Sequence, residues 1–236
     1  MKNRTFIVAL LCGLAGLCSC GKTGIDIDIS DPQEIQRVDS IVDDDLLKAF
    51  VKAVGEESIH FGHTPPNIDG ISFILEGLVY DSLITVHRII LPTGETRIDT
   101  SKSSGGGYEN AVYKHHFFDQ VGSIARQKFY RKAHNQPEPV ISTIHPTYII
   151  GSGNDFSAYY CIQTNSPEEA NPIWAYLISA TIVDGPDSDS IANCKIGKKI
   201  IHTNGDPIAG YYEGTIRIMH PLDTLPIPCV EWDTIP

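Results

Sequence analysis

Near the start of the chain, apolar residues recur at three- and four-residue steps between polar ones. This spacing predicts an amphipathic helical segment over about 31–55. Asp31 begins an Asp-Pro-Gln-Glu run typical of a helix N-terminus, and Gly55 is suited to a C-cap. The pattern allows one helix, or two with a break near Ser40, the second then starting at the acidic residues 43–45.

After residue 70 the pattern changes to short runs of β-branched and aromatic residues separated by turn residues. We predict nine strands: Ile71–Asp81, Thr85–Leu91, Tyr108–Phe118, Ser123–Lys132, Thr147–Ile150, Phe156–Gln163, Ile173–Val183, Ile191–His202 and Tyr211–His220. Residues 92–94 form a predicted hairpin turn, and 103–107 a flexible loop. No connection is long and apolar enough for a crossover helix, so we expect an antiparallel sheet.

Alternation within the strands predicts which faces are buried. In Phe156–Gln163 every second residue, starting with Phe156, is apolar and should face a core. In Ile173–Val183 both faces are largely apolar, which indicates cover on both sides, with the N-terminal helix as one cover. About eight strands with a helix packed across them favour a closed or nearly closed barrel, spanning about 70–222 and followed by an extended C-terminal tail.

The first twenty residues have the organisation of an export signal. Lys2 and Arg4 precede an apolar run that is too short to span a bilayer, and the run ends in Leu17-Cys18-Ser19-Cys20. This tetrad resembles a bacterial lipobox, which implies lipidation of Cys20 and removal of residues 1–19. Acyl chains at one cysteine hold a soluble domain at a membrane surface. We therefore expect a signal peptide at 1–19, a lipidated cysteine and flexible tether at 20–30, and a single domain at 31–236.

The net charge disfavours one class of partner, and the cysteine content limits the possible disulfides and metal sites. The net charge of −11 becomes −13 when two basic residues and no acidic residue leave with residues 1–19, which disfavours nucleic acid as a partner. Cys161, Cys194 and Cys229 would remain as free thiols or as one disulfide, and the sequence leaves their pairing open. None of these cysteines lies in a zinc-binding spacing.

The chain resembles Bacteroidetes outer-membrane lipoproteins of unassigned activity that have a lipocalin-like, or calycin, β-barrel. The resemblance rests on the lipobox and on the segments LLKAFVKAV, TPPNIDG, YIIGSGNDFSAYYCI and ISATIVDG. It implies a mainly β fold, with an antiparallel lipocalin-like barrel of about eight strands and an N-terminal amphipathic helix across it. It also implies a lipid-anchored protein of the cell outer membrane, on its periplasmic or its surface side.

No common nucleophile or nucleotide motif occurs, so no catalytic residue and no cofactor is predicted. His60 and His63 lack an evident third ligand, and no metal site is predicted. His115 and His116 are adjacent, so only one of them can face the interior of a strand pair. The basic run Arg126–Lys132 is most simply a solvated strand; as a patch it would suit an anionic or glycan partner.

Binding is the favoured function. A small apolar or carbohydrate ligand would enter the barrel, or an envelope protein would dock on its rim, with Tyr160, Trp174 and Tyr176 as ligand-binding candidates. The first alternative is a structural or assembly subunit of an outer-membrane complex with a filled barrel. The second is a hydrolase, which would need a cleft that unites histidine and carboxylate side chains.

Overall fold

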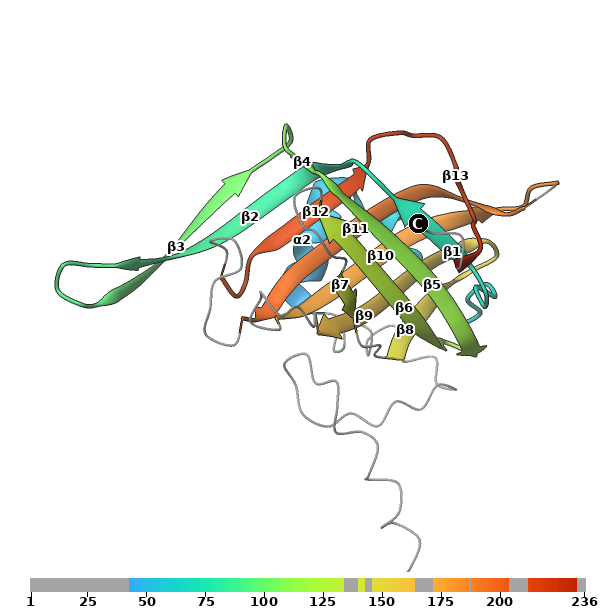
Figure 1. The fold of residues 1–236 in the computed structure, drawn as a ribbon, viewed down its shortest axis with the longest axis horizontal. Coiled ribbons are helices and arrows are strands. Elements are labelled where there is room, and N and C mark those ends of the chain that lie inside the picture. Colours follow the sequence, from blue (N-terminus) through green and yellow to red (C-terminus); the bar gives the residue numbers. More distant parts are fainter. Residues whose placement is uncertain are drawn as a thin grey trace, which may run out of the picture.

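The computed structural model describes residues 43–133, 140–142, 146–163, 172–186, 188–203 and 212–232. Within these ranges the chain forms one α-helix, a short 3-10 helix and thirteen strands of one antiparallel sheet (Figure 1). The helices are α2 (Asp44–Val54) and η1 (Glu56–Ser58). The strands are β1 (Ser72–Leu75), β2 (Leu78–Ile90), β3 (Thr96–Ser103), β4 (Tyr108–Glu109), β5 (Ala111–Val121), β6 (Ile124–Ala133), β7 (Val140–Ser142), β8 (Pro146–Ser152), β9 (Asp155–Gln163), β10 (Ile173–Val183), β11 (Ser190–His202), β12 (Ile216–Pro221) and β13 (Ile227–Pro228). The predicted mainly β, antiparallel fold is confirmed, but the curved sheet of the described residues is not closed into the predicted barrel.

The strand path runs β1-β5-β6-β8-β9-β10-β11-β12-β2-β3. Beside this path, β4 pairs with β2, β7 with β6 and β13 with β11. Two residues separate β1 from β2, and one residue separates β4 from β5. β1 pairs with β5, and the start of β2 pairs with β4, with Val79 opposite Tyr108.

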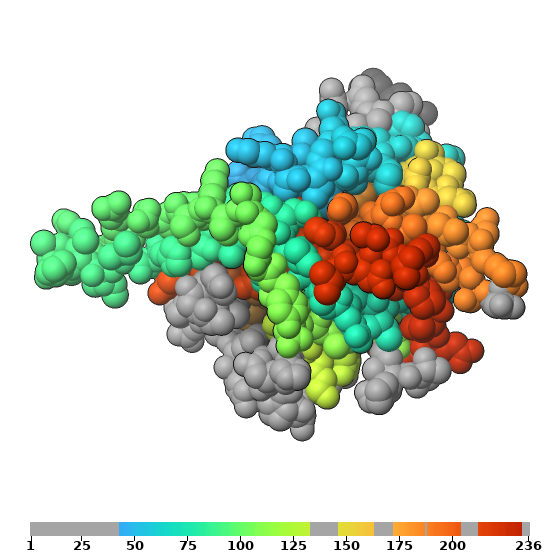
Figure 2. Space-filling view, turned by 90° about the horizontal axis from the view of Figure 1, so that it is seen from above, coloured from blue at the N-terminus to red at the C-terminus, as the bar shows by residue number. Residues whose placement is uncertain are grey.

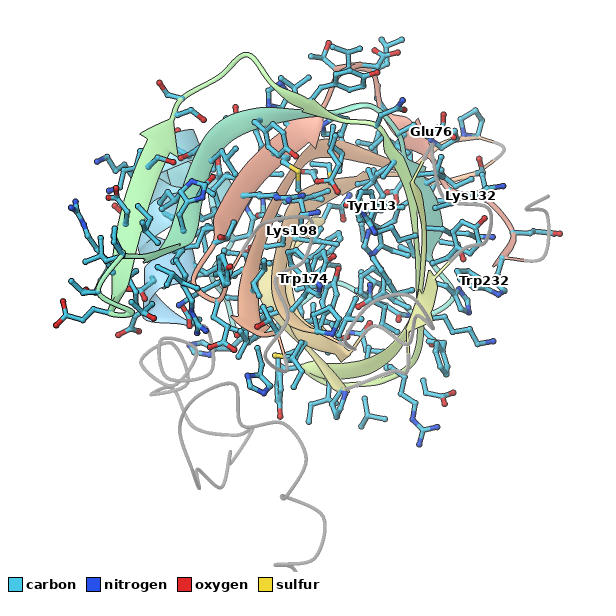
Figure 3. All side chains as sticks on the ribbon, turned by 60° about the vertical axis from the view of Figure 1, so that its left-hand side comes forward. Glu76, Tyr113, Lys132, Trp174, Lys198 and Trp232 are labelled. Carbon is cyan, nitrogen blue, oxygen red and sulfur yellow. The ribbon has the colours of Figure 1, made fainter. Side chains whose placement is uncertain are left out.

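The sheet is strongly curved, and its two faces are packed differently (Figure 3). The larger apolar cluster lies on the concave face and includes Phe73, Tyr113, Phe129, Tyr160, Trp174, Tyr176, Ile196 and Met219. Phe156, Ala158, Tyr160 and Ile162 of β9 all belong to it, so the predicted alternation of that strand is confirmed.

The convex face carries α2. Leu46 and Phe50 of the helix share a second apolar cluster with Tyr159 and Leu177 of the sheet. The run 174–180 of β10 is buried throughout, which confirms the prediction that this strand is covered on both sides. The helix lies close to the sheet at Gly197, where an added Cβ would come within 2.9 Å of the Phe50 ring.

Both ends of α2 follow from local chemistry. The side chain of Asp43 accepts hydrogen bonds from the backbone N–H groups of Asp45 and Leu46, which makes Asp43 the N-cap. Gly55 ends the helix with φ 91°, a conformation that glycine adopts without strain. The first part of the predicted 31–55 segment lies outside the described residues.

Several strand predictions are wrong, among them Tyr211–His220, because β12 begins only at Ile216. The first predicted strand does not run unbroken over Ile71–Asp81, because the chain breaks at Glu76 and Gly77, where Gly77 has φ 59°, and β2 then continues past residue 81 to Ile90. Residues 96–103 form β3, which was not predicted because all eight are exposed and polar residues occupy both faces. No helix within the described ranges is long and apolar enough to cross a membrane.

Candidate functional site

Four charged side chains and a tyrosine meet on the concave face. We call them the Glu109 cluster: Glu109, Tyr113, Arg131, Lys198 and Arg217. They come from β4, β5, β6, β11 and β12 and are therefore brought together by the curvature of the sheet. Figure 3 shows Tyr113 and Lys198 inside the curve and Lys132, next to Arg131 in sequence, outside it.

The Glu109 carboxylate is the centre of the cluster. Lys198 Nζ donates to Glu109 Oε1 and Oε2 at 2.8 and 2.7 Å, and to the Tyr113 hydroxyl oxygen at 2.6 Å. Arg217 donates to Oε2 at 3.1 Å, and an Arg131 guanidinium nitrogen lies 3.6 Å from Oε1. Tyr113 donates its own hydroxyl proton to Oε1. Three cationic groups thus converge on one carboxylate.

Burial, together with three cationic groups around one carboxylate, shifts the pKa values of Glu109, Lys198 and Tyr113. Burial alone would raise the pKa of Glu109, but Lys198 and Arg217 hold it well below its ordinary value. Burial lowers the pKa of Lys198 to about 7; Glu109 opposes this shift, while Arg217 and Arg131 reinforce it. Burial also raises the pKa of Tyr113, and the neighbouring Glu109 adds to that rise. The Lys198 amine therefore holds its proton less tightly than an exposed lysine does.

Aromatic rings border the cluster. Trp174 lies under two of its cations, with its ring centroid 5.2 Å from Lys198 Nζ and 5.9 Å from the Arg217 guanidinium carbon. Tyr160 and Tyr176 stack on each other with centroids 5.2 Å apart and ring planes 5° apart. All three residues predicted as ligand-binding candidates therefore lie on the concave face, where each is at most 7% exposed.

His115 lies further along the same face. Its Nδ1 is 2.7 Å from Gln127 Nε2 and 3.2 Å from the Tyr160 hydroxyl, and both groups can donate to it. Burial lowers its pKa to about 3, so the ring is neutral and the proton resides on Nε2. Nε2 has no hydrogen-bond partner among the described residues. His116 lies on the other face, stacked on Phe118, so the prediction that only one of the two faces inward is confirmed.

Sequence reasoning missed the Glu109 cluster, although a signal was present. Lys198 is in phase with Ile196 and Ile200, both buried, so alternation alone places its side chain inside. Arg131 is in phase with the buried Phe129 and is thereby separated from the solvated basic side chains of the same strand. A charged residue at a strand position whose neighbours two residues away are buried and apolar is the sequence pattern that could have revealed this cluster.

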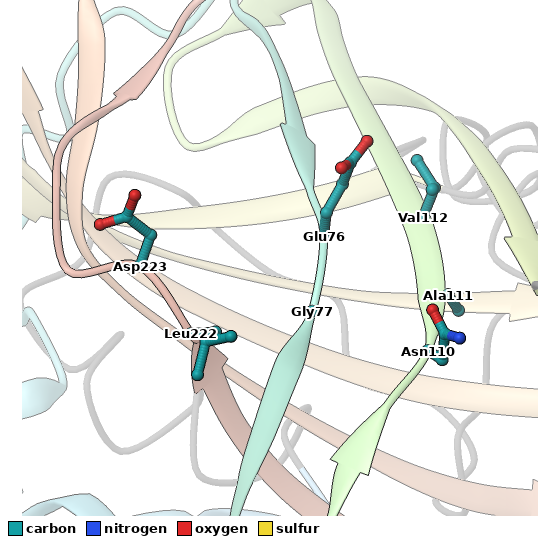
Figure 4. A pocket seen from close by; sticks show the side chains of 7 residues that line it. All are labelled: Glu76, Gly77, Asn110, Ala111, Val112, Leu222 and Asp223. Atoms are coloured by element: carbon teal, nitrogen blue, oxygen red, sulfur yellow. The ribbon is translucent and has the colours of Figure 1, made fainter.

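A separate groove of about 600 Å³ lies at the break between β1 and β2 (Figure 4). Its lining residues come from three segments: Glu76, Gly77, Asn110, Ala111, Val112, Leu222 and Asp223. None of the three predicted ligand-binding residues lines it. Its two carboxylates make it a poor site for an anion.

Cysteine and metal chemistry add little within the described residues. Cys161 is disulfide-bonded, whereas Cys194 and Cys229 are free, so no bridge joins two of these three. The described part of the chain holds no group of three or more histidine, cysteine or acidic side chains placed to bind a metal ion.

Comparison of the chain with family models, curated proteins and solved structures finds no significant match. The resemblance to Bacteroidetes lipocalin-like lipoproteins therefore stays a prediction, and function has to be argued from the concave face itself.

Proposed function

We propose that the protein binds a small ligand on the concave face of its sheet, and that this ligand combines an anionic group with an apolar body. The observation that carries the proposal is the convergence of Lys198, Arg131 and Arg217 on the single carboxylate of Glu109. Burying charge is costly, and such clusters are often kept where they serve binding. A second anion beside these three cations would offset the surplus positive charge.

The aromatic residues next to the cluster suit the apolar part of such a ligand. Trp174 adjoins the cations, and the stacked pair of Tyr160 and Tyr176 lies on the same concave face. Aromatic faces with a few convergent polar groups are typical of small-molecule sites. A sugar ring that carries an acidic group would fit the same combination of charge and flat rings.

For the fold we propose a lipocalin-like, nearly closed barrel of about eight strands with α2 across its outside. Support comes from two pairings at the ends of the sheet: β1 with β5, and the start of β2 with β4. Since β2 also pairs with β12, and short links connect β1 to β2 and β4 to β5, the two sides of the strand path come close to each other here. A barrel of this size has an interior wide enough for its own side chains or one small ligand.

Binding is tested with two probes of equal chain length, dodecanoate and dodecanol, titrated into the protein by calorimetry. We expect dodecanoate to bind at least about tenfold more tightly, because only the carboxylate pairs with the cationic groups. Arg131→Gln should remove most of this preference, while Lys132→Gln, an exposed neighbour on the other face, should leave it unchanged. Equal affinity for both probes, or binding of neither, would contradict the proposal.

The second candidate is an assembly subunit whose interior is filled by its own side chains. The observation that favours it is the near-complete burial of large rings on the concave face, including Phe73, Phe117 and Phe156 at 0% exposure. Native mass spectrometry of protein purified gently from its own membrane separates the two functions. A retained small mass supports binding, and a stable complex with another envelope protein and no small ligand supports assembly.

We also propose that the protein is anchored in the outer membrane by acyl chains on Cys20. The support is the lipobox-like tetrad Leu17–Cys20 after a basic and apolar leader. Cys20→Ser should abolish palmitate labelling and shift the protein from the detergent phase to the aqueous phase. Cys194→Ser, which removes a buried thiol, is the matched control and should change neither readout. Unchanged labelling of Cys20→Ser would refute the anchor.

A further inference from the structure

The β2–β3 hairpin projects from the body of the molecule. Figures 1 and 2 show it extending away from the rest of the sheet, with its turn at the far end. Every residue of β3 is exposed, and Ile90 and Ile98 are 76% and 66% exposed. Two-stranded ribbons are at best marginally stable alone in water, so an uncovered hairpin with exposed isoleucines calls for an explanation.

The outer edge of β3 is open. It is an end of the strand path, and no other described strand pairs with it. At the turn, the Leu91 N–H donates to the Glu95 carbonyl, and the register from there pairs Ile89 with Arg97. In an antiparallel ladder, hydrogen-bonded positions alternate. The N–H and C=O groups of Arg97 and Asp99 therefore face β2, and those of Ile98 are presented at the open edge.

Among symmetric antiparallel pairings of β3 with itself, only one sets opposite charges within β3 (Thr96–Ser103) against each other. Two antiparallel copies with Ile98 opposite Ile98 place Arg97 opposite Asp99, twice by symmetry, and Thr96 opposite Thr100. Shifting the symmetry axis to Arg97 or to Asp99 sets like charges opposite each other, which is destabilising. Both charged side chains are accessible, at 64% and 52% exposure, and their contact within one chain is long at 3.9 Å.

We propose that β3 pairs with β3 of a second copy of this chain in this register, which forms a four-stranded sheet across a two-fold axis. The pairing satisfies the open backbone groups of both strands. The pairing also places the exposed isoleucines of both copies on one face of the new sheet. Ile98 lies opposite Arg88 of β2, and Ile90 is two residues from Arg88, so Ile98 and Ile90 share a face of the hairpin. The interface is isologous, as expected of a closed dimer.

The test is charge reversal followed by mixing, with the full chain in a nonionic detergent and sedimentation equilibrium as the readout. Arg97→Asp and Asp99→Arg each place like charges across the axis, and each should raise the dimer dissociation constant on the order of tenfold. An equimolar mixture of the two variants again sets opposite charges against each other, so it should dimerise about as well as the unmodified protein. Thr93→Lys at the turn, outside the five central pairs, is the control and should leave dimerisation unchanged.

A second variant tests the backbone edge. Ile98→Pro removes an N–H that faces away from β2, so the hairpin keeps its own ladder while the new pairing loses its central bonds. We expect this variant to be monomeric, with circular dichroism close to that of the unmodified protein. Unmodified protein that remains monomeric at millimolar concentration would overturn the proposal. So would a dimer that none of these variants weakens, or two reversed variants that fail to associate when mixed.

Discussion

Lys198 and Lys199 are neighbours on β11 that face opposite sides of the sheet and meet opposite surroundings. The Lys198 amine is on the concave face, where it shares the carboxylate of Glu109 with Arg131 and Arg217. Two arginines thus compete with it for one anion, and burial with this competition lowers its pKa to about 7.

The Lys199 amine is on the convex face, where one cation lies between two carboxylates. It lies 2.6 Å from Asp43 and 3.1 Å from Asp45, at the first turn of α2. Asp43 is also the N-cap, so one carboxylate both caps the helix and ties it to the sheet. The comparison shows that the concave cluster holds surplus positive charge while the convex one holds surplus negative charge. The concave cluster could therefore accept an added anion, whereas the convex contacts hold α2 against the sheet.

The largest expected effect comes from removing the shared carboxylate. Glu109→Gln leaves Lys198, Arg131 and Arg217 buried or half-buried without their common anion, which should cost about 3–5 kcal/mol of unfolding free energy. Urea unfolding measures it. Asp45→Asn, which removes a carboxylate that is 74% exposed from the convex cluster, is the control and should cost less than about 1 kcal/mol. Equal losses would show that the two clusters do not differ as described.

Acid should destabilise the folded protein through the buried His115 of the concave face. Because the pKa of His115 is lowered from 6.5 to about 3, the unfolded chain binds a proton between these values that the folded chain does not. The stabilisation is complete above pH 6.5 and is lost as pH falls toward 3. Between pH 6.5 and pH 5 the protein should lose about 2 kcal/mol of its free energy of unfolding through this residue.

The measurement is the slope of unfolding free energy against pH in that window. His115→Gln, which keeps a polar side chain without a titrating ring, should flatten the slope. His87→Gln, on the exposed hairpin, should leave it unchanged. An identical slope in the His115 variant would contradict the assignment.

On the convex face, Gly197→Ala should cost about 1–2 kcal/mol, because its Cβ would lie 2.9 Å from Phe50 and 3.1 Å from Leu46. Thermal unfolding of a double-mutant cycle checks the cause. If the Leu46 side chain is part of the obstacle, the cost of Gly197→Ala should be smaller in a Leu46→Ala background. Strict additivity would mean that the methyl group is accommodated elsewhere.

The smallest effect is expected at the helix cap. Asp43→Ala removes the acceptor for two backbone N–H groups and one partner of Lys199, and should cost about 1 kcal/mol. Asp44→Ala, one residue later and without a capping role, should be nearly neutral in the same urea titration. A similar loss from both would indicate that the helix responds to general charge and not to capping.

Much of the fold could be predicted from alternation and turn chemistry. The faces of β9 and the two-sided burial of β10 follow from which residues are apolar at every second position. β3 could not be predicted in this way, because both its faces are exposed and period-two alternation carries no signal there. The break at Glu76 and Gly77 was missed because the residues around it are as apolar as those of a continuous strand.

The candidate site was predictable in part. Tyr160, Trp174 and Tyr176 were identified from strand phase and aromatic character, and they do lie on one face. The charged side chains beside these rings were not identified, because Lys198 and Glu109 are 89 positions apart in the sequence and Arg217 and Glu109 are 108 apart. The phase of each strand says that a side chain faces inward, but only the strand order says which side chains meet.

The position of α2 bears on how the chain reaches its native state. The helix comes early in the sequence, yet Asp43 contacts Tyr159 across 116 positions and Lys199 across 156. Synthesis delivers these partners long after the helix, so the apolar side of the helix has no sheet to dock on until most of the polypeptide has emerged. Contacts this distant in sequence slow folding. Until the sheet forms, Leu46 and Phe50 on the apolar side of α2 have no partners to pack against.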